Sequence, residues 1–347
     1  MAKNAVWGGL VLMLLIGCGA AATSGGAGTG SDPANENGAG ETHAAGATSA
    51  CDAHVEEALG HLDRGAPLAA ERSLMRAARA DRGCVAAYLN LAIVQRQTER
   101  LDEARANVRR ALAIDATNVH AFHQLVLVHL AEARTDVGAL ELASLACRQG
   151  AQIDASFAPL HNSCGVVDVD RGRIVEALAR FERAYTLDPT LYEAWMNFGQ
   201  ITLSFRGYED AERAFRGALE AEPNDYDALI GLGVAVRGLG RMDAAREHYE
   251  QARAVSPDRP EAWYNLGILY QDHLDGQPEQ LSRAEAYYET FVSKAHGDPE
   301  YAEAVDEVLR CCPVTRNGRA PRECRPGRLQ NLRRAIGALG GRDTSGC

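Results

Sequence analysis

The sequence predicts an all-α protein, a stack of about seven helical hairpins followed by a Cys- and Arg-rich C-terminal extension. The first observation is a period in the alanines. Alanine recurs at intervals of 34 residues four times and of 39 residues twice, at Ala70, Ala104, Ala143, Ala177, Ala211, Ala245 and Ala284. A fixed period of this length is typical of arrays in which each unit contacts only its neighbours. The second observation is the low aromatic content of 6%, which favours helices packed through small residues.

The period divides the chain into units that share small and large positions. The units begin at Cys51, Val85, Val119, Ala158, Tyr192, Tyr226 and Pro260. Position 20 is alanine in all seven units, allowing for five-residue insertions in the third and seventh. Position 8 is small in six units: Ala58, Ala92, Gly165, Gly199, Gly233 and Gly267, with Val126 in the other. Small residues here let the two helices of a hairpin approach closely. Large apolar residues near positions 7 and 24 are expected to fill the space between hairpins.

Breaks in the pattern predict where the helices end. Asp188-Pro189, Glu222-Pro223 and Ser256-Pro257 close three units, because proline cannot continue a helix. Five-residue insertions near 133–137 and 276–280 are expected to lengthen the helices or the loop of the third and seventh units. A further helix over 301–310 is expected to cap the last hairpin. The repeat array with this cap is therefore assigned to residues 51–309.

The repeated motifs resemble a known family. Trp195-Met196-Asn197-Phe198-Gly199 is followed by Tyr208, Ala211, Phe215 and Pro223, and Trp263-Tyr264-Asn265-Leu266-Gly267 repeats the first part. These residues resemble the tetratricopeptide repeat (TPR), and the resemblance covers roughly residues 51–298. It implies a right-handed superhelical solenoid that binds protein partners in a concave groove. It implies no cofactor, no metal and no catalytic residues, and we expect a protein that is not an enzyme.

The N-terminus predicts an exported, lipid-anchored protein. Lys3 precedes a short apolar stretch, Ala5 to Ile16, which is too short to span a bilayer. Leu15-Ile16-Gly17-Cys18 resembles the lipobox of bacterial lipoproteins, which implies a signal peptide over 1–17 and lipidation of Cys18. Gly19 follows, similar to outer-membrane lipoproteins, so we expect an outer-membrane anchor facing the periplasm. An ordinary secretory signal is the alternative. Residues 18–50 are rich in Gly, Ala, Ser and Thr and are expected to form a disordered linker.

Eight cysteines remain after Cys18, and an even number in an exported chain suggests disulfides. Cys51 and Cys84 are positions 1 and 34 of the first unit, at the same end of an antiparallel hairpin, so we expect them to pair. Cys147 and Cys164 occupy positions that face each other across adjacent hairpins, and a bridge or two buried thiols are equally compatible with this placement. Residues 310–347 form the Cys/Arg-rich tail, with a short amphipathic helix through Leu329, Leu332, Ile336 and Leu339. Its candidates for two further bridges are Cys311, Cys312, Cys324 and Cys347.

Candidate groove residues are taken from the first helix of each unit. They are Asn90, Ile93, Arg96, His120, His123, Met196, Asn197, Asp227, Ile230, Val234, Arg237, Tyr264, Asn265 and Ile268. The mixture of acids, arginines and apolar residues suits an extended or helical peptide, with basic side chains as one possibility. The histidines lack a carboxylate or cysteine that would complete a metal-ligand set, so polar groove residues are the preferred interpretation.

Charge and motifs argue against two classes of function. The net charge is −11, although residues 310–347 carry nine arginines against Glu323 and Asp343. An acidic body disfavours nucleic-acid binding, which needs a basic stripe on the folded part. Gly231-Leu232-Gly233 follows no strand, so it is not a dinucleotide loop.

The prediction is a lipid-anchored periplasmic adaptor, similar to TPR lipoproteins of pilus-secretin assembly or gliding-motility machinery. The alternatives are a regulator of cell-wall or polysaccharide enzymes and, more remotely, an enzyme with its site in the tail. The sequence predicts no oligomeric state.

Overall fold

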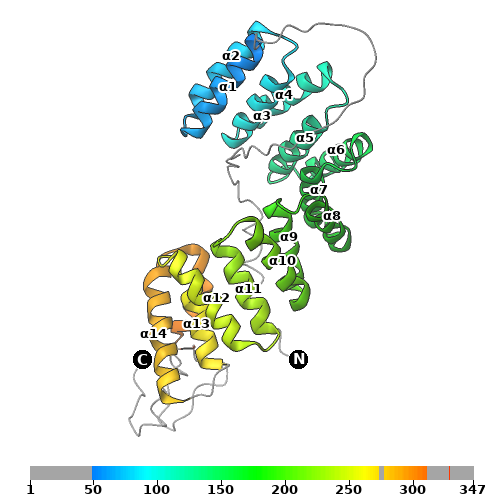
Figure 1. The fold of residues 1–347 in the computed structure, drawn as a ribbon. Helices are drawn as coiled ribbons and strands as arrows, with labels where there is room; N and C mark the ends of the chain where they lie inside the picture. Colours follow the sequence, from blue (N-terminus) through cyan, green and yellow to red (C-terminus); the bar gives the residue numbers. More distant parts are fainter. Residues whose placement is uncertain (1–48, 273–276, 311–327, 329–347) are drawn as a thin grey trace, which may run out of the picture. The chain divides into compact units, whose positions relative to one another are not determined.

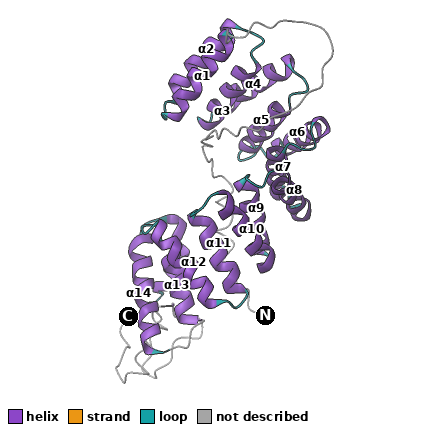
Figure 2. Ribbon diagram, viewed as in Figure 1, coloured by secondary structure: helices purple, strands orange, loops and turns teal. Residues whose placement is uncertain are grey.

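The computed structural model describes residues 49–272, 277–310 and 328. In these ranges there are fifteen α-helices, one short 3-10 helix and no strand, which confirms the all-α prediction (Figure 1, Figure 2). Several predictions lie outside the described residues: the signal peptide, Cys18, the linker up to residue 48, the tail cysteines Cys311, Cys312, Cys324 and Cys347, and the amphipathic helix near 329–339.

Fourteen helices form seven successive pairs joined by short turns. The pairs are α1 (Ala50–Asp63) with α2 (Pro67–Ala80), α3 (Val85–Gln97) with α4 (Leu101–Ile114), α5 (Val119–Glu132) with α6 (Ala139–Ile153), α7 (Ala158–Asp170) with α8 (Ile174–Leu187), α9 (Tyr192–Ser204) with α10 (Tyr208–Ala221), α11 (Tyr226–Gly238) with α12 (Met242–Val255), and α13 (Glu261–Asp272) with α14 (Pro278–Ala295). The first helix of every pair begins within one residue of the unit start that the period predicts.

The described chain divides into two compact units, and the boundary falls inside α8, between residues 180 and 181. In the N-terminal unit, the first helices α1, α3, α5 and α7 contact one another in order, and α2, α4 and α6 pack against their own partners. In the C-terminal unit, α9, α11 and α13 do the same. Here the 3-10 helix η2 (Pro299–Tyr301) leads into α15 (Ala302–Leu309), which packs against α14.

Small residues bring the helices of a hairpin together. All seven period alanines are completely buried. At position 8, a Cβ on Gly233 would lie 2.4 Å from the ring of Tyr249, which is position 24 of the same unit. A Cβ on Gly267 would likewise lie 2.6 Å from Tyr288. The aromatic ring of the second helix therefore rests directly on the backbone of the first helix, and any side chain at position 8 would displace it.

The turns within the hairpins share one backbone feature. Position 15 is in the left-handed region in five units: Gly65, Glu99, Gly172, Arg206 and Gly240. In each of these turns, the next N–H donates to the carbonyl five residues earlier, as Gly207 N does to Thr202 O at 2.8 Å. This hydrogen bond closes the end of the first helix. Three of the five positions are glycine, which adopts this conformation without steric cost.

The two insertions are accommodated differently. In the third unit, residues 133–138 form a longer connection between α5 and α6, whereas residues 205–207 suffice between α9 and α10. In the seventh unit, α14 has 18 residues, compared with 14 in α12. A longer loop and a longer helix were the two outcomes expected from the insertions, and the described residues show one of each.

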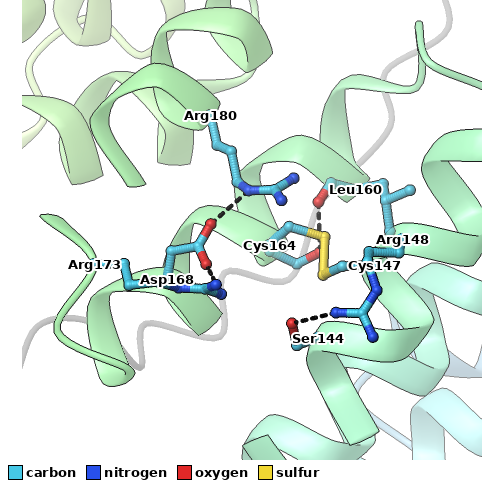
Figure 3. Close-up of a disulfide and its surroundings, with 9 residues drawn as sticks. Ser144, Cys147, Arg148, Leu160, Cys164, Asp168, Arg173 and Arg180 are labelled. Atoms are coloured by element: carbon cyan, nitrogen blue, oxygen red, sulfur yellow. Dashed lines mark hydrogen bonds and ion pairs between the residues drawn. A yellow bond between two sulfur atoms is a disulfide. The ribbon is translucent and has the colours of Figure 1, made fainter. Parts of the chain in front are cut away.

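Two disulfides lie in the N-terminal unit. Cys51 at the start of α1 is bonded to Cys84, which directly precedes α3. Cys147 on α6 is bonded to Cys164 on α7, with a Cα–Cα distance of 5.8 Å (Figure 3). Beyond Cys164 on the same helix, the buried carboxylate of Asp168 pairs with both Arg173 and Arg180. The structure therefore has both bridges that the unit positions suggested.

No helix in the described part of the chain is both long enough and apolar enough to cross a membrane.

Candidate functional site

The predicted groove residues lie on the first helices, which form a layer in each unit. Two surfaces result, one in each unit. The N-terminal face consists of Asn90, Ile93 and Arg96 on α3 with His120 and His123 on α5. The C-terminal face consists of Met196 and Asn197 on α9, Asp227, Ile230, Val234 and Arg237 on α11, and Tyr264, Asn265 and Ile268 on α13.

Aromatic contacts dominate the N-terminal face. The rings of His120 and His123 make edge-to-face contacts with Phe157, which directly precedes α7, at centroid distances of 4.6 and 5.8 Å. Burial, with smaller effects of the nearby Arg96 and His120, lowers the pKa of His123 to about 4. His123 is therefore neutral at pH 7. The Nε of Arg96 is buried and has no hydrogen-bond partner among the described residues.

Three predicted groove residues of the C-terminal face are buried instead. Met196 and Ile268 are each 6% exposed and belong to the same hydrophobic cluster as Phe215 and Tyr249. Asn265 is 3% exposed. Position 5 or 9 on a first helix was expected to face a partner, and this expectation is wrong for Met196 and Ile268, because neighbouring side chains cover them. Ile230 and Val234, at the same positions on α11, are only partly buried.

The acidic group of this face is already paired within the fold. Arg259, in the turn before α13, makes two hydrogen bonds to Asp227 at 2.7 and 3.1 Å and one to Glu261 at 2.7 Å. The hydroxyls of Tyr226 and Tyr301 also donate to Glu261, at 3.1 and 2.9 Å. Asp227 was expected among the acids of the groove, and the structure shows that the adjacent turn already supplies its counter-charge.

Two predicted groove asparagines, Asn90 and Asn265, use their amides within their own helices. Asn90 Nδ2 and Asn265 Nδ2 each donate to the carbonyl four residues earlier, Ala86 O and Glu261 O, at 2.9 Å. The other end of the Asn265 amide, Oδ1, is buried without a partner in the described structure. Arg237 is similar, because its NH1 is buried without a partner and its guanidinium lies 6.0 Å from the centroid of the Tyr249 ring.

A residue from the tail completes one end of the C-terminal face. Arg328 Nε donates to Glu307 Oε1 of α15 at 2.8 Å, and Arg328 NH1 donates to Asp272 Oδ2 of α13 at 2.9 Å. Tyr264 OH donates to the other oxygen of Glu307 at 3.0 Å. The period and the motifs pointed to none of Arg328, Asp272 and Glu307. The contrast between the basic tail and the acidic body was the signal that could have suggested this contact.

No group of three histidine, cysteine or acidic side chains that could hold a metal ion occurs among the described residues.

Family models identify the repeat. A tetratricopeptide repeat model matches residues 55–119 and 198–254, and a second TPR model matches residues 236–273. The chain contains tetratricopeptide repeats. The matched ranges include most of both candidate faces, and the helix pairs, the position-8 glycines and the buried alanines agree with this assignment.

Similar proteins share segments of this chain. Anaphase-promoting complex subunit 3 of Schizosaccharomyces pombe is 30% identical over 96 residues, which is 28% of this chain and 14% of that protein. Matches to the first three curated relatives span only 14%, 10% and 31% of their lengths. TPR segments therefore recur in proteins that are otherwise different, and the matches support repeats that contact other proteins.

Two solved structures of bacterial pilus proteins have a similar fold. PilF of Pseudomonas aeruginosa aligns with a TM-score of 0.52 and 20% identity, covering 61% of this chain and 95% of that one. PilW, described as a widely conserved type IV pilus biogenesis factor, aligns with a TM-score of 0.52 and 17% identity, covering 62% of this chain and 98% of that one. At these identities the likeness concerns the fold alone.

Proposed function

We propose that this protein is a lipid-anchored adaptor of the bacterial cell envelope that binds a polypeptide partner on its C-terminal face. In this proposal, Cys18 carries the lipid, residues 18–50 form the tether and the repeats face the periplasm. The protein binds its partner without catalysing a reaction. The partner belongs to an envelope machine of the pilus-secretin or gliding-motility type. The fold likeness to PilF and PilW supports the choice of machine.

One observation carries the choice of face. Ile230 and Val234 of α11 are partly buried apolar side chains on the same helix as Arg237, whose NH1 has no hydrogen-bond partner in the described residues. Apolar surface beside a positively charged guanidinium suits an amphipathic or extended segment. The segment would bury the two aliphatic side chains and place a carbonyl or carboxylate group near the charge of Arg237.

The test is affinity capture from solubilised envelopes after crosslinking in intact cells. We expect Ile230→Arg with Val234→Arg to lose the partner, because two charges would enter the apolar contact. Met196 is unsuitable for this purpose because it is buried, and its replacement would unfold the unit. The control is Phe205→Arg with Val255→Arg, which adds the same charge to the same unit at side chains that are 68% and 43% exposed.

The outcomes separate the candidate functions. Recovery of a secretin or motility protein with the wild type and the control, but not with the Ile230/Val234 variant, supports the proposal. A cell-wall enzyme recovered in the same way would favour the regulator instead. Retention of every partner by the Ile230/Val234 variant would show that the C-terminal face is not the binding surface. Circular dichroism must show that both double variants are folded.

A further inference from the structure

Arg328 is held by side chains from three helices and is the one residue of 311–347 that the structure describes. Its Nε donates to Glu307 and its NH1 to Asp272, so each carboxylate receives a separate edge of the guanidinium. The same NH1 lies 3.3 Å from Tyr288 OH and 3.4 Å from Gln271 Oε1. The guanidinium carbon is 6.0 Å from the centroid of the Tyr264 ring. Three-quarters of the Arg328 side chain is buried, with 23% exposed.

The groups around Arg328 are themselves oriented by hydrogen bonds. Tyr264 OH donates to Glu307 Oε2 at 3.0 Å, which leaves Oε1 free to accept from Arg328. Tyr288 OH donates to Gln271 Oε1 at 2.9 Å. Burial raises the pKa of the Tyr264 hydroxyl to about 12, so it remains a neutral donor at physiological pH. The contacts of Arg328 are thus made by groups that other parts of the fold keep in place.

This arrangement suits a guanidinium better than an ammonium. A guanidinium has five N–H donors fixed in one plane, and its flat face stacks on aromatic rings. Here the two carboxylates come from different helices and approach different edges, while Tyr264 presents an aromatic ring. A lysine ammonium is a compact point charge on a flexible stem and could not make this set of contacts at once. Two carboxylates also exceed the charge of one arginine, so the site keeps its preference for a cation.

The site shares its surface with the proposed partner-binding face. Tyr264, Gln271 and Asp272 of α13 occupy positions 5, 12 and 13 of the seventh unit, and Ile230 and Val234 of α11 occupy positions 5 and 9 of the sixth, so helical spacing places them on the same side of the first helices. Glu307 is contributed by α15, the helix that follows the last pair. A polypeptide bound along this face would therefore meet the guanidinium of Arg328 at the end nearest α15.

We propose that Tyr264, Asp272, Tyr288 and Glu307 form an arginine-recognition site, which Arg328 of the same chain occupies until an arginine of a protein partner replaces it. The proposal rests on the proposed function in one respect, that this face binds a polypeptide. It adds the class of side chain that is recognised and the group that competes with it. Arg328 then acts as an internal competitor, because it belongs to the same chain as the site.

The test uses the purified full-length chain and a labelled synthetic peptide with the sequence of residues 325–334. A matched peptide carries citrulline at the position of Arg328, which keeps the shape and removes the charge. Affinity is measured by fluorescence anisotropy for the wild type, for Arg328→Ala and for Arg310→Ala. Arg310 is an exposed arginine paired with Asp306 near the same helix, so it controls for the loss of one positive charge.

We expect the arginine peptide to bind Arg328→Ala at least tenfold more tightly than the wild type or Arg310→Ala. We expect the citrulline peptide to lose this binding. Adding Glu307→Gln to Arg328→Ala should weaken the arginine peptide by tenfold or more. Thermal melting must show that each variant is folded, and Asp272→Asn, at a half-exposed side chain, replaces Glu307→Gln if that variant is not.

Three results would overturn the inference. Equal affinity for the wild type and Arg328→Ala would mean that Arg328 does not compete for the site. Equal binding of the citrulline peptide would mean that no guanidinium is recognised. Absence of binding to Arg328→Ala would mean that Arg328 only fastens the tail. No envelope partner takes part in these measurements, so their failure is distinct from a failure of the capture experiment.

Discussion

Arg259 changes the charge that the C-terminal face presents. Asp227 and Glu261 would leave this surface acidic, but the guanidinium of Arg259 binds both and also lies over the ring of Tyr226, 4.0 Å from its centroid. The same arrangement, one arginine between two carboxylates, recurs at the far end of α13. There Asp272 and Glu307 enclose Arg328.

His123 makes the stability of the N-terminal unit sensitive to acid. Its folded-state pKa of about 4 is below the usual histidine value of about 6.5, because burial disfavours the charged ring. The neutral form stabilises the fold fully above pH about 6.5, and this contribution is lost as the pH falls toward 4. His123 is only partly buried, so we expect a loss of about 1–3 kcal/mol between these limits.

The measurement is an NMR titration of the His123 ring together with urea unfolding at pH 7 and pH 4.5. We expect a titration midpoint near pH 4 for His123. We expect His123→Gln to reduce the loss of stability between the two pH values. A midpoint near pH 6.5, or an unchanged pH dependence in His123→Gln, would show that burial does not control this ring.

At the scale of elements, the intra-hairpin turns show where local sequence and local geometry disagree. Position 15 is left-handed in five turns, but Glu99 and Arg206 hold it without being glycine, at φ of 59° and 62°. A non-glycine residue in this region costs about 1 kcal/mol. The turn persists because the hydrogen bond from the following N–H and the packing of both helices impose it.

Arg206→Gly should therefore stabilise the turn between α9 and α10. We expect the free energy of unfolding to rise by up to about 1 kcal/mol, since the strain is relieved while glycine adds some chain entropy in the unfolded state. The reciprocal change Gly240→Arg, between α11 and α12, should lower it by about 1 kcal/mol. Urea unfolding and amide hydrogen exchange of α9–α12 measure the stability of both variants. Equal destabilisation by the two changes would contradict this account of the turns.

The sequence predicted the helix pairs closely because the period reports on packing inside each hairpin. Alanine at position 20 and glycine at position 8 are needed wherever Tyr249 or Tyr288 rests on the facing backbone. Surface exposure was predicted less well, because it depends on neighbouring units. Ile230 and Met196 share position 5, yet only Met196 is covered by the surrounding core. Arg259 and Arg328 come from a turn and from the tail, where the period carries no information about contacts.

At the scale of the whole molecule, the proposed lipid anchor decides where the repeats act. We expect Cys18→Ser to abolish incorporation of labelled palmitate and to release the protein from the membrane fraction, because the acyl chains supply the membrane affinity. Cys347→Ser is the control, since it removes a cysteine and keeps Cys18. Continued labelling of Cys18→Ser would rule out the lipobox, whereas loss of labelling in both variants would point to a general defect in export.

The two disulfides also set how the N-terminal unit would respond to mechanical load. Cys51 and Cys84 are 33 residues apart in the sequence, and Cys147 and Cys164 are 17 residues apart. When the chain is pulled from its ends, these segments cannot extend even after their helices are lost. The closed segments therefore shorten the fully extended chain by about 110 Å and about 60 Å, respectively. An oxidised protein held at one end and bound to a machine at the other would therefore stretch less far than a reduced one.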